Sequence, residues 1–381
     1  MTTVLEDLTP GRLSRERAPR PAPQPGERRR NAARVVGVTL LTAFILTMPY
    51  DMKWAGSSFA LDYGVIIGMV VLATSVLGWI GEFTLATVAQ MGFGLVVVNL
   101  LQGAGLPFAI ILPVVILSSI PISILLGVFA LRLRGVDFAI ATLAFGYTAQ
   151  KTFFQTYLGV QGGFGGTESK AISRPAGFTG SEGFYYLLMG SLLLMALICW
   201  AVRRSWVGTS LTALRESEAA FSVLGHSPGA YKLFTICLSG AIATVAGAYF
   251  GMLQGLVPSN YFQPALAILY FGFAVAGGMG TVAGACVAGV AFGAIPKYFD
   301  SLSEGHFVGY DQFFIGIVAL VVVLWIPGGL ADIGRRLWRR IEGRPPGPPL
   351  VSPLEEIDVR DGVEGAIAAA AAGLESEGAG A

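Results

Sequence analysis

The stretch LPFAIILPVVILSSIPISILLGVFAL, residues 106–131, contains no charged side chain and is followed by Arg132. A helix needs about 20 apolar residues to cross the hydrocarbon core of a bilayer, so this stretch predicts a membrane-spanning helix. Similar apolar runs predict nine further spans, at residues 35–48, 59–80, 83–102, 136–158, 183–202, 233–256, 262–278, 280–299 and 311–330. The expected fold is therefore all-α, a polytopic transmembrane helical bundle of about ten spans.

The composition of the whole chain agrees with this expectation. Of its 381 residues, 54% are hydrophobic and only 13% are charged, about half the charged share of a soluble domain. A soluble domain of this size could not keep so much apolar surface away from water. The formal net charge is +1, which also argues against nucleic-acid binding, since that function normally needs a basic face.

Several kinds of chemistry are excluded by the residues present. The three cysteines (Cys199, Cys237 and Cys286) lie in apolar runs without a C-x-x-C pair, and the two histidines (His226 and His306) form no H-E-x-x-H motif. We therefore expect no metal site. The phosphate-binding motif G-x-x-x-x-G-K-[ST] is also missing. We expect a protein that is not itself an enzyme, so any ATP hydrolysis must come from another polypeptide.

The distribution of Lys and Arg predicts the orientation. If ten spans are counted from an N-terminus placed inside, 20 of the 25 Lys and Arg residues fall in inner segments, which is the bias of cytoplasmic loops. Both ends are then cytoplasmic. Residues 1–34, rich in Pro and Arg, and residues 341–381 predict disordered tails around a transmembrane domain at 35–340. A cleaved signal peptide is the alternative for the first apolar run, but no A-x-A site follows it.

Polar groups within the predicted spans are candidates for a solute path, because such groups are costly in lipid. These candidates are Gln90, Thr142, Tyr147, Gln150 and Lys151. Hydrogen bonding between helices is an equally good explanation for each. Glycine is also frequent, with 51 residues, and the run 277–280 predicts a break between two helices, whereas other glycines allow close helix packing.

Residues 203–225, RRSWVGTSLTALRESEAAFSVLG, form an inner segment between two predicted spans. Leu211, Leu214, Glu218 and Phe221 recur at helical spacing, while Gly225 suits the residue that ends a helix. We expect one amphipathic helix at about 208–225. A surface for docking another protein explains its small residues better than membrane binding does.

This segment resembles the EAA…G coupling loop of ATP-binding-cassette importer permeases. Three further stretches narrow the resemblance to LivM-like permease subunits of branched-chain amino acid importers: RGVDFAIATLAFG at 134–146, QGGFGGT at 161–167 and IPGGL at 326–330. The resemblance implies an ABC importer permease in the bacterial cytoplasmic membrane, with an ATPase-coupling interface in the inner segment. The residues implied for that interface are Ser210, Arg215, Glu216, Glu218, Ala219, Ala220 and Gly225.

The resemblance also implies partners and adds Gly162 and Gly163 to the candidates for the translocation path. The implied partners are a second, LivH-like permease subunit, two cytoplasmic ATPase subunits that bind ATP-Mg, and an extracytoplasmic solute-binding protein. Departures from the family pattern at Ala86, Asp137 and Gln161 leave the cargo open among branched-chain amino acids, urea, short amides and other small solutes. An ion-coupled secondary transporter or channel acting alone is the alternative function, and a membrane scaffold is a third.

Overall fold

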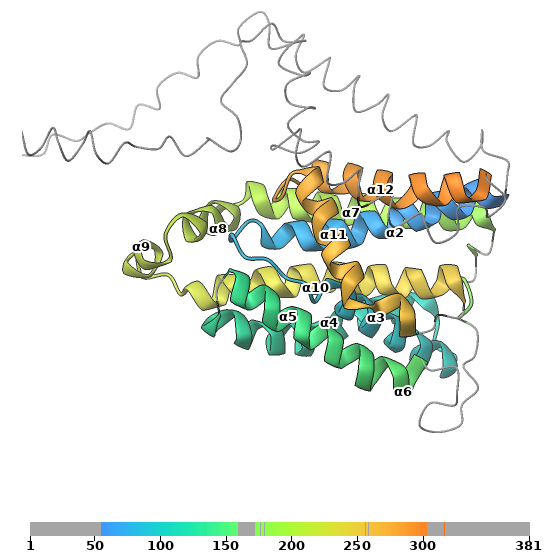
Figure 1. The fold of residues 1–381 in the computed structure, drawn as a ribbon, viewed down its shortest axis with the longest axis horizontal. Coiled ribbons are helices and arrows are strands. Elements are labelled where there is room, and N and C mark those ends of the chain that lie inside the picture. Colours follow the sequence, from blue (N-terminus) through green and yellow to red (C-terminus); the bar gives the residue numbers. More distant parts are fainter. Residues whose placement is uncertain are drawn as a thin grey trace, which may run out of the picture. The chain divides into compact units, whose positions relative to one another are not determined.

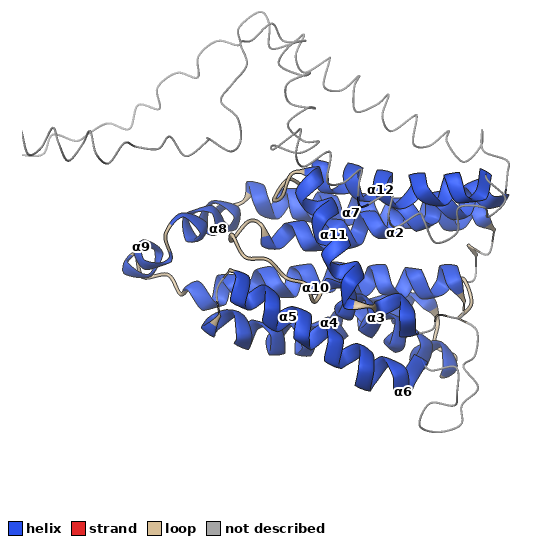
Figure 2. Ribbon diagram, in the orientation of Figure 1, coloured by secondary structure: helices blue, strands red, loops and turns tan. Residues whose placement is uncertain are grey.

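The computed structural model describes residues 55–133, 135–158, 172–175, 177–178, 180–255, 257, 259–302 and 316. Within these residues every regular element is a helix and none is a strand (Figure 2). The all-α prediction is therefore confirmed for the described part of the chain. The two predicted tails, the first predicted span and nearly all of the last one lie outside it, as do Gly162 and Gly163.

Eight of the predicted spans coincide with helical segments. In chain order, the helices before the polar segment are α2 (Ala55–Leu77), α3 (Thr87–Gly103), α4 (Phe108–Arg132), α5 (Val136–Thr148), the π-helix η1 (Ala149–Phe154), α6 (Gln155–Leu158) and α7 (Ser181–Arg204). Those that follow are α8 (Trp206–Glu216), α9 (Glu218–Val223), α10 (Pro228–Gln254), the short 3₁₀ helix η2 (Ser259–Phe262), α11 (Pro264–Gly277) and α12 (Val282–Leu302).

Four described helices are long and apolar enough to cross a membrane, namely α2, α4, α7 and α10. α3, α11 and α12 are shorter apolar helices. The chain therefore has the helices of a multi-pass membrane protein. The count of ten spans includes runs outside the described residues and stays a prediction.

Two pairs of glycines bring α2 and α12 close together (Figure 1). A Cβ atom added to Gly289 would lie 2.6 Å from the Cα atom of Gly68, and one added to Gly293 would lie 2.9 Å from the Cα atom of Gly64. Each helix thus presents a G-x-x-x-G pair to the other. Small residues at such spacing let helix backbones touch where lipid offers no hydrophobic driving force, which explains part of the high glycine content.

A second close crossing joins α3 to α10. An added Cβ atom would overlap the carbonyl of Thr244 from Gly94, and the carbonyl of Met91 from Gly247. The break predicted in the run 277–280 is also present, because α11 ends at Gly277 and α12 begins at Val282. Two of its residues, Gly278 and Gly280, have φ angles of +96° and +80°, which side chains other than glycine rarely adopt.

Candidate functional site

The segment between α7 and α10 consists of the two short helices α8 and α9 and lies at one end of the helices it joins (Figure 1). The single helix expected at about 208–225 is divided at Ser217, whose φ of −156° and ψ of 109° are extended. The Ser217 hydroxyl accepts a hydrogen bond of 3.2 Å from the Ala220 N–H group. Serine commonly caps helices in this way, so the division has a local cause that the periodicity did not show.

The apolar side of this segment faces the rest of the protein. Leu211, Leu214 and Phe221 are buried. The ring centroid of Phe221 lies 5.2 Å from that of Tyr231, near the start of α10, in an edge-to-face arrangement. Aromatic pairs of this geometry add to the stabilisation from burial. The segment is therefore packed against α10 and is not a free surface loop.

An ionic triad connects α9 to the interior. The Lys232 ammonium lies 3.4 Å from a carboxylate oxygen of Glu82 and 3.2 Å from one of Glu218. The side chains of Lys232 and Glu82 are only 5% and 8% exposed, whereas that of Glu218 is 27% exposed. The second Glu82 oxygen accepts a hydrogen bond of 2.9 Å from the Gly135 N–H group. The triad of Glu82, Lys232 and Glu218 is thus bonded to the start of α5.

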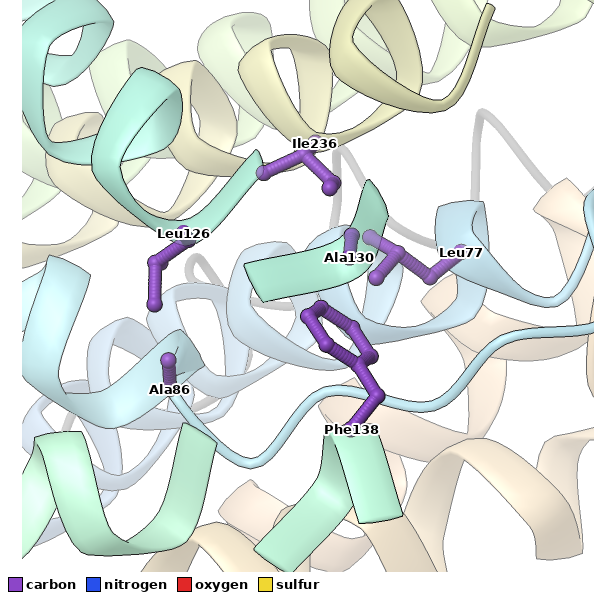
Figure 3. Close-up of a cluster of buried hydrophobic side chains, with 6 residues drawn as sticks. All are labelled: Leu77, Ala86, Leu126, Ala130, Phe138 and Ile236. Atoms are coloured by element: carbon purple, nitrogen blue, oxygen red, sulfur yellow. The ribbon is translucent and has the colours of Figure 1, made fainter. Parts of the chain in front are cut away.

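Each member of the triad comes from a different part of the chain. Glu82 lies in the loop between α2 and α3, Lys232 in the first turns of α10, and Glu218 at the start of α9. A buried apolar cluster joins the same helix ends, with side chains from α2, the loop before α3, α4, α5 and α10 (Figure 3). Its residues are Leu77, Ala86, Leu126, Ala130, Phe138 and Ile236. A displacement of α9 would therefore act on several helices at once.

A second set of bonds holds the end of α7. The Arg203 guanidinium donates to the carbonyl of Gly280, and the Trp79 indole N–H donates to the same oxygen at 3.0 Å. The Gly280 N–H group in turn donates to the Ser75 hydroxyl at 3.0 Å. These contacts tie the helix that leads into α8 to the end of α2 and to the turn between α11 and α12.

The remaining residues predicted for this segment have simpler surroundings. The Arg215 side chain lies over Gly81, with its Cγ atom 3.1 Å from where a Cβ atom would be. Ser210 donates to the carbonyl of Trp206 in its own helix at 3.1 Å. Gly225 has a φ of +83°, the left-handed conformation expected of a residue that ends a helix. Five of the predicted residues are exposed on the segment: Arg215, Glu216, Ala219, Ala220 and Gly225.

The segment also exposes large apolar side chains. Trp206, Val223 and Leu224 are 71%, 86% and 74% exposed. Val223 and Leu224 adjoin the exposed Ala219–Ala220 pair. An exposed apolar patch rimmed by polar residues marks a binding surface more often than chance. The EAA…G motif does not include Val223 or Leu224, so the resemblance gave no signal for these two residues.

The candidates for a solute path differ in their surroundings. Thr142 is fully buried and accepts a hydrogen bond of 3.0 Å from the Leu85 N–H group. Gln90 is buried and its amide nitrogen lies 3.4 Å from the Ser123 hydroxyl, and Gln150 is also buried. Tyr147 is 57% exposed. Lys151 is also exposed. Three of the five polar candidates are thus buried inside the protein, and two are exposed on its surface.

Comparisons with known proteins identify the family to which the chain is similar. A family model described as "Branched-chain amino acid transport system / permease component" matches residues 57–323. The high-affinity branched-chain amino acid transport system permease protein LivM of Escherichia coli is 28% identical over 255 residues, which cover 61% of this chain and 59% of that protein. LivM of Salmonella typhimurium is 29% identical over the same shares.

A more distant relative is the probable branched-chain amino acid transport permease protein LivH of Methanocaldococcus jannaschii, 23% identical over 185 residues, covering 47% of this chain and 57% of that protein. The matched part of the chain thus spans 59% of the length of the two LivM relatives. No solved structure matches the chain.

Proposed function

This chain belongs to the family of branched-chain amino acid transport permease components, and we propose that it is one permease subunit of an ATP-driven importer. The cargo would be a branched-chain amino acid or a related small solute. Its partners would be a second, LivH-like permease, two cytoplasmic ATPase subunits carrying ATP-Mg, and an extracytoplasmic solute-binding protein. This chain would supply half of the translocation path and no catalytic residue.

The ionic triad is the observation that carries this proposal. Glu218 begins α9 and pairs with Lys232, which also pairs with Glu82, and Glu82 accepts a hydrogen bond from Gly135. A force applied to α9 therefore has a bonded route to α10, to the α2–α3 loop and to the start of α5. A segment that only lay on the membrane surface would not need such a route.

The exposed side of the segment fits a protein partner. Val223 and Leu224 are large and apolar, and Ala219 and Ala220 beside them are small. A groove on an ATPase subunit would bury the two large side chains while the alanines allow close approach. ATP binding would then move α8 and α9 together, and the triad would pass that movement to the spanning helices.

This assignment places the segment on the cytoplasmic side of a bacterial inner membrane. The bias of Lys and Arg in the sequence supports that orientation. With ten spans, both termini would also be cytoplasmic.

Reconstitution tests the proposal directly. The chain, its second permease and the ATPase subunits are placed in vesicles, and uptake of radiolabelled leucine is measured with the binding protein on the outside. We expect uptake to require ATP and all subunits. Uptake by this chain alone, driven only by an ion gradient, would show instead that it is a self-sufficient secondary transporter.

A further inference from the structure

One face of the continuous helix formed by α5, η1 and α6 carries exposed polar side chains. Tyr147, Thr148, Lys151, Thr152 and Gln155 are all exposed. We refer to these five residues as the polar face. Lipid is a poor environment for such groups, and the cost is greatest for a charged one.

The π-helical segment keeps these residues in line. They repeat every four positions, and in an α-helix a residue four positions along is rotated by about 40°. The segment Ala149–Phe154 is a π-helix, whose wider turn offsets that rotation. Its opposite side is buried, as Gly146, Gln150 and Phe154 show. Such π segments interrupt α-helices often at functional sites.

The exposed faces of two other helices provide an internal comparison. Along α4 from Ile110 to Leu131, and along α7 from Leu187 to Ile198, every exposed residue is apolar. The large ones are Ile110, Ile116, Leu117, Ile120, Ile124, Leu125, Val128, Phe129, Leu131, Leu193, Leu194, Leu197 and Ile198. Those faces suit lipid. The polar face does not, so it needs water or another protein against it.

Lys151 gives the polar face its charge. Its ammonium lies 5.9 Å from the ring centroid of Tyr147, and no carboxylate among the described residues pairs with it. Thr148 and Thr152 donate their hydroxyl hydrogens to carbonyl groups of their own helix, which leaves their oxygens able only to accept. The ammonium is therefore the strongest donor on this face.

The position of Lys151 along the helix also matters. It lies 15 residues beyond Val136, about 22 Å from the end of α5 that contacts the triad. If the α8–α9 segment is cytoplasmic, Lys151 lies in the outer part of its helix, on the side from which an importer receives its solute.

We propose that Lys151 binds the carboxylate of the transported solute, on a polar face that lines a water-filled path closed on its other side by the second permease. This inference rests on the proposed function and narrows its cargo. An ammonium on an otherwise neutral face favours a small solute with a free carboxylate, such as an amino acid. Urea and simple amides lack that group.

Cysteine labelling tests where the polar face lies. Thr148→Cys and Gln155→Cys are made in a chain whose three native cysteines are replaced by alanine, and Leu117→Cys on the exposed face of α4 is the matched control. In the assembled importer, a membrane-impermeant charged thiol reagent should label the first two and not the control. Millimolar leucine should slow labelling of Thr148→Cys, and the same concentration of leucine amide should not.

Charge substitutions test Lys151 itself. Lys151→Gln should lower the leucine uptake rate about tenfold, the effect expected from losing one hydrogen bond to a charged group, while Lys151→Arg should restore most of it. Lys297→Gln is the matched control. Lys297 lies 15 residues along α12 and its ammonium lies 5.8 Å from the ring centroid of Tyr63, but it is not part of the polar face.

Three results would overturn the inference: unlabelled cysteines on the polar face, equal protection by leucine and leucine amide, or normal leucine uptake by Lys151→Gln. Each is read beside ATP-dependent uptake by the wild-type complex in the same vesicles. If that uptake is present, only the role of Lys151 and its face fails. If it is absent, the proposed function fails.

Discussion

The variant Lys232→Met tests how much the ionic triad contributes to the stability of the protein. Methionine keeps most of the side-chain length but removes the charge, so Glu82 stays buried without its cation. Removing one partner of a buried ion pair costs about 3–5 kcal/mol. The contact with Glu218 adds little, because that carboxylate is 27% exposed and partly exposed pairs contribute about 0.2–1 kcal/mol.

The double variant Lys232→Met with Glu82→Gln should recover most of this loss. It removes both buried charges, and replacing a buried pair by neutral groups is often close to neutral. The glutamine oxygen can still accept from the Gly135 N–H group. We therefore expect the double variant to be more stable than the single one by about 2–4 kcal/mol, so the two substitutions are far from additive.

Coupling should not recover with stability. Both variants lack the bond from Glu218 to α10, so ATP hydrolysis should continue while leucine uptake falls. Stability is measured by thermal inactivation of the assembled complex, and coupling by the ratio of uptake to hydrolysis in vesicles. Arg204→Met is the control, because Arg204 is exposed at the end of α7 and its guanidinium lies over the ring of Trp200.

Either of two outcomes would refute this reasoning. A double variant as unstable as Lys232→Met would mean that the unpaired Glu82 charge is not the source of the loss. A double variant that is stable and transports at the wild-type rate would mean that the triad holds the fold but does not carry the movement of α9.

Three further predictions follow from single contacts. Val223→Asp should weaken binding of the ATPase subunits about tenfold in a pull-down titration, because an exposed apolar side chain of the docking surface is replaced by a charge; unchanged binding would exclude it from the interface. Gly247→Ala should destabilise the complex by about 1–3 kcal/mol through overlap with α3, whereas Gly190→Ala, with nothing within 4 Å of its added Cβ atom, should be neutral in the same thermal assay. Thr142→Val should destabilise the complex by about 1–3 kcal/mol, because the Leu85 N–H group loses its hydrogen-bond acceptor. Solute preference in competition uptake should not change. A changed preference would mean that Thr142 contacts the solute.

The apolar runs predict the helices well but miss where some begin. The run at 233–256 starts after Lys232, since a lysine is not expected inside a span. The helix α10 in fact begins at Pro228 and includes Lys232, which is buried. Its charge is balanced by Glu82, which lies far away in the sequence. A pattern read along one segment cannot show a partner brought in by the fold.

The residues of the candidate site, like the helices, can be predicted only in part from the sequence. Glu218 and Gly225 belong to the EAA…G motif. In the structure Glu218 pairs with Lys232, and Gly225 has the positive φ angle of a residue that ends a helix. Which side of a helix faces a path depends on its rotation, and the sequence does not give that rotation. Thr142 and Tyr147 lie on the same helix, yet one is fully buried and the other is 57% exposed.

Asp62, in contrast, is a signal that the sequence does contain. It lies within an apolar run that predicts only a span, and the structure buries it on α2. One of its carboxylate oxygens has no hydrogen-bond partner in the described part of the chain. An acidic residue in a spanning run is a signal in itself, and it was available in the sequence.

The triad and the polar face belong to one mechanical unit, because α5 connects them. Gly135, whose N–H group bonds Glu82, directly precedes α5, and the same continuous helix carries Lys151 toward its other end. A movement of α9 that pulls on Lys232 would displace Glu82 and shift or rotate this helix from its base. Lys151, the proposed solute-binding residue, would then move relative to the second permease. In the proposed importer, coupling of ATP binding to release of the solute would thus require no contact between the α8–α9 segment and the solute itself.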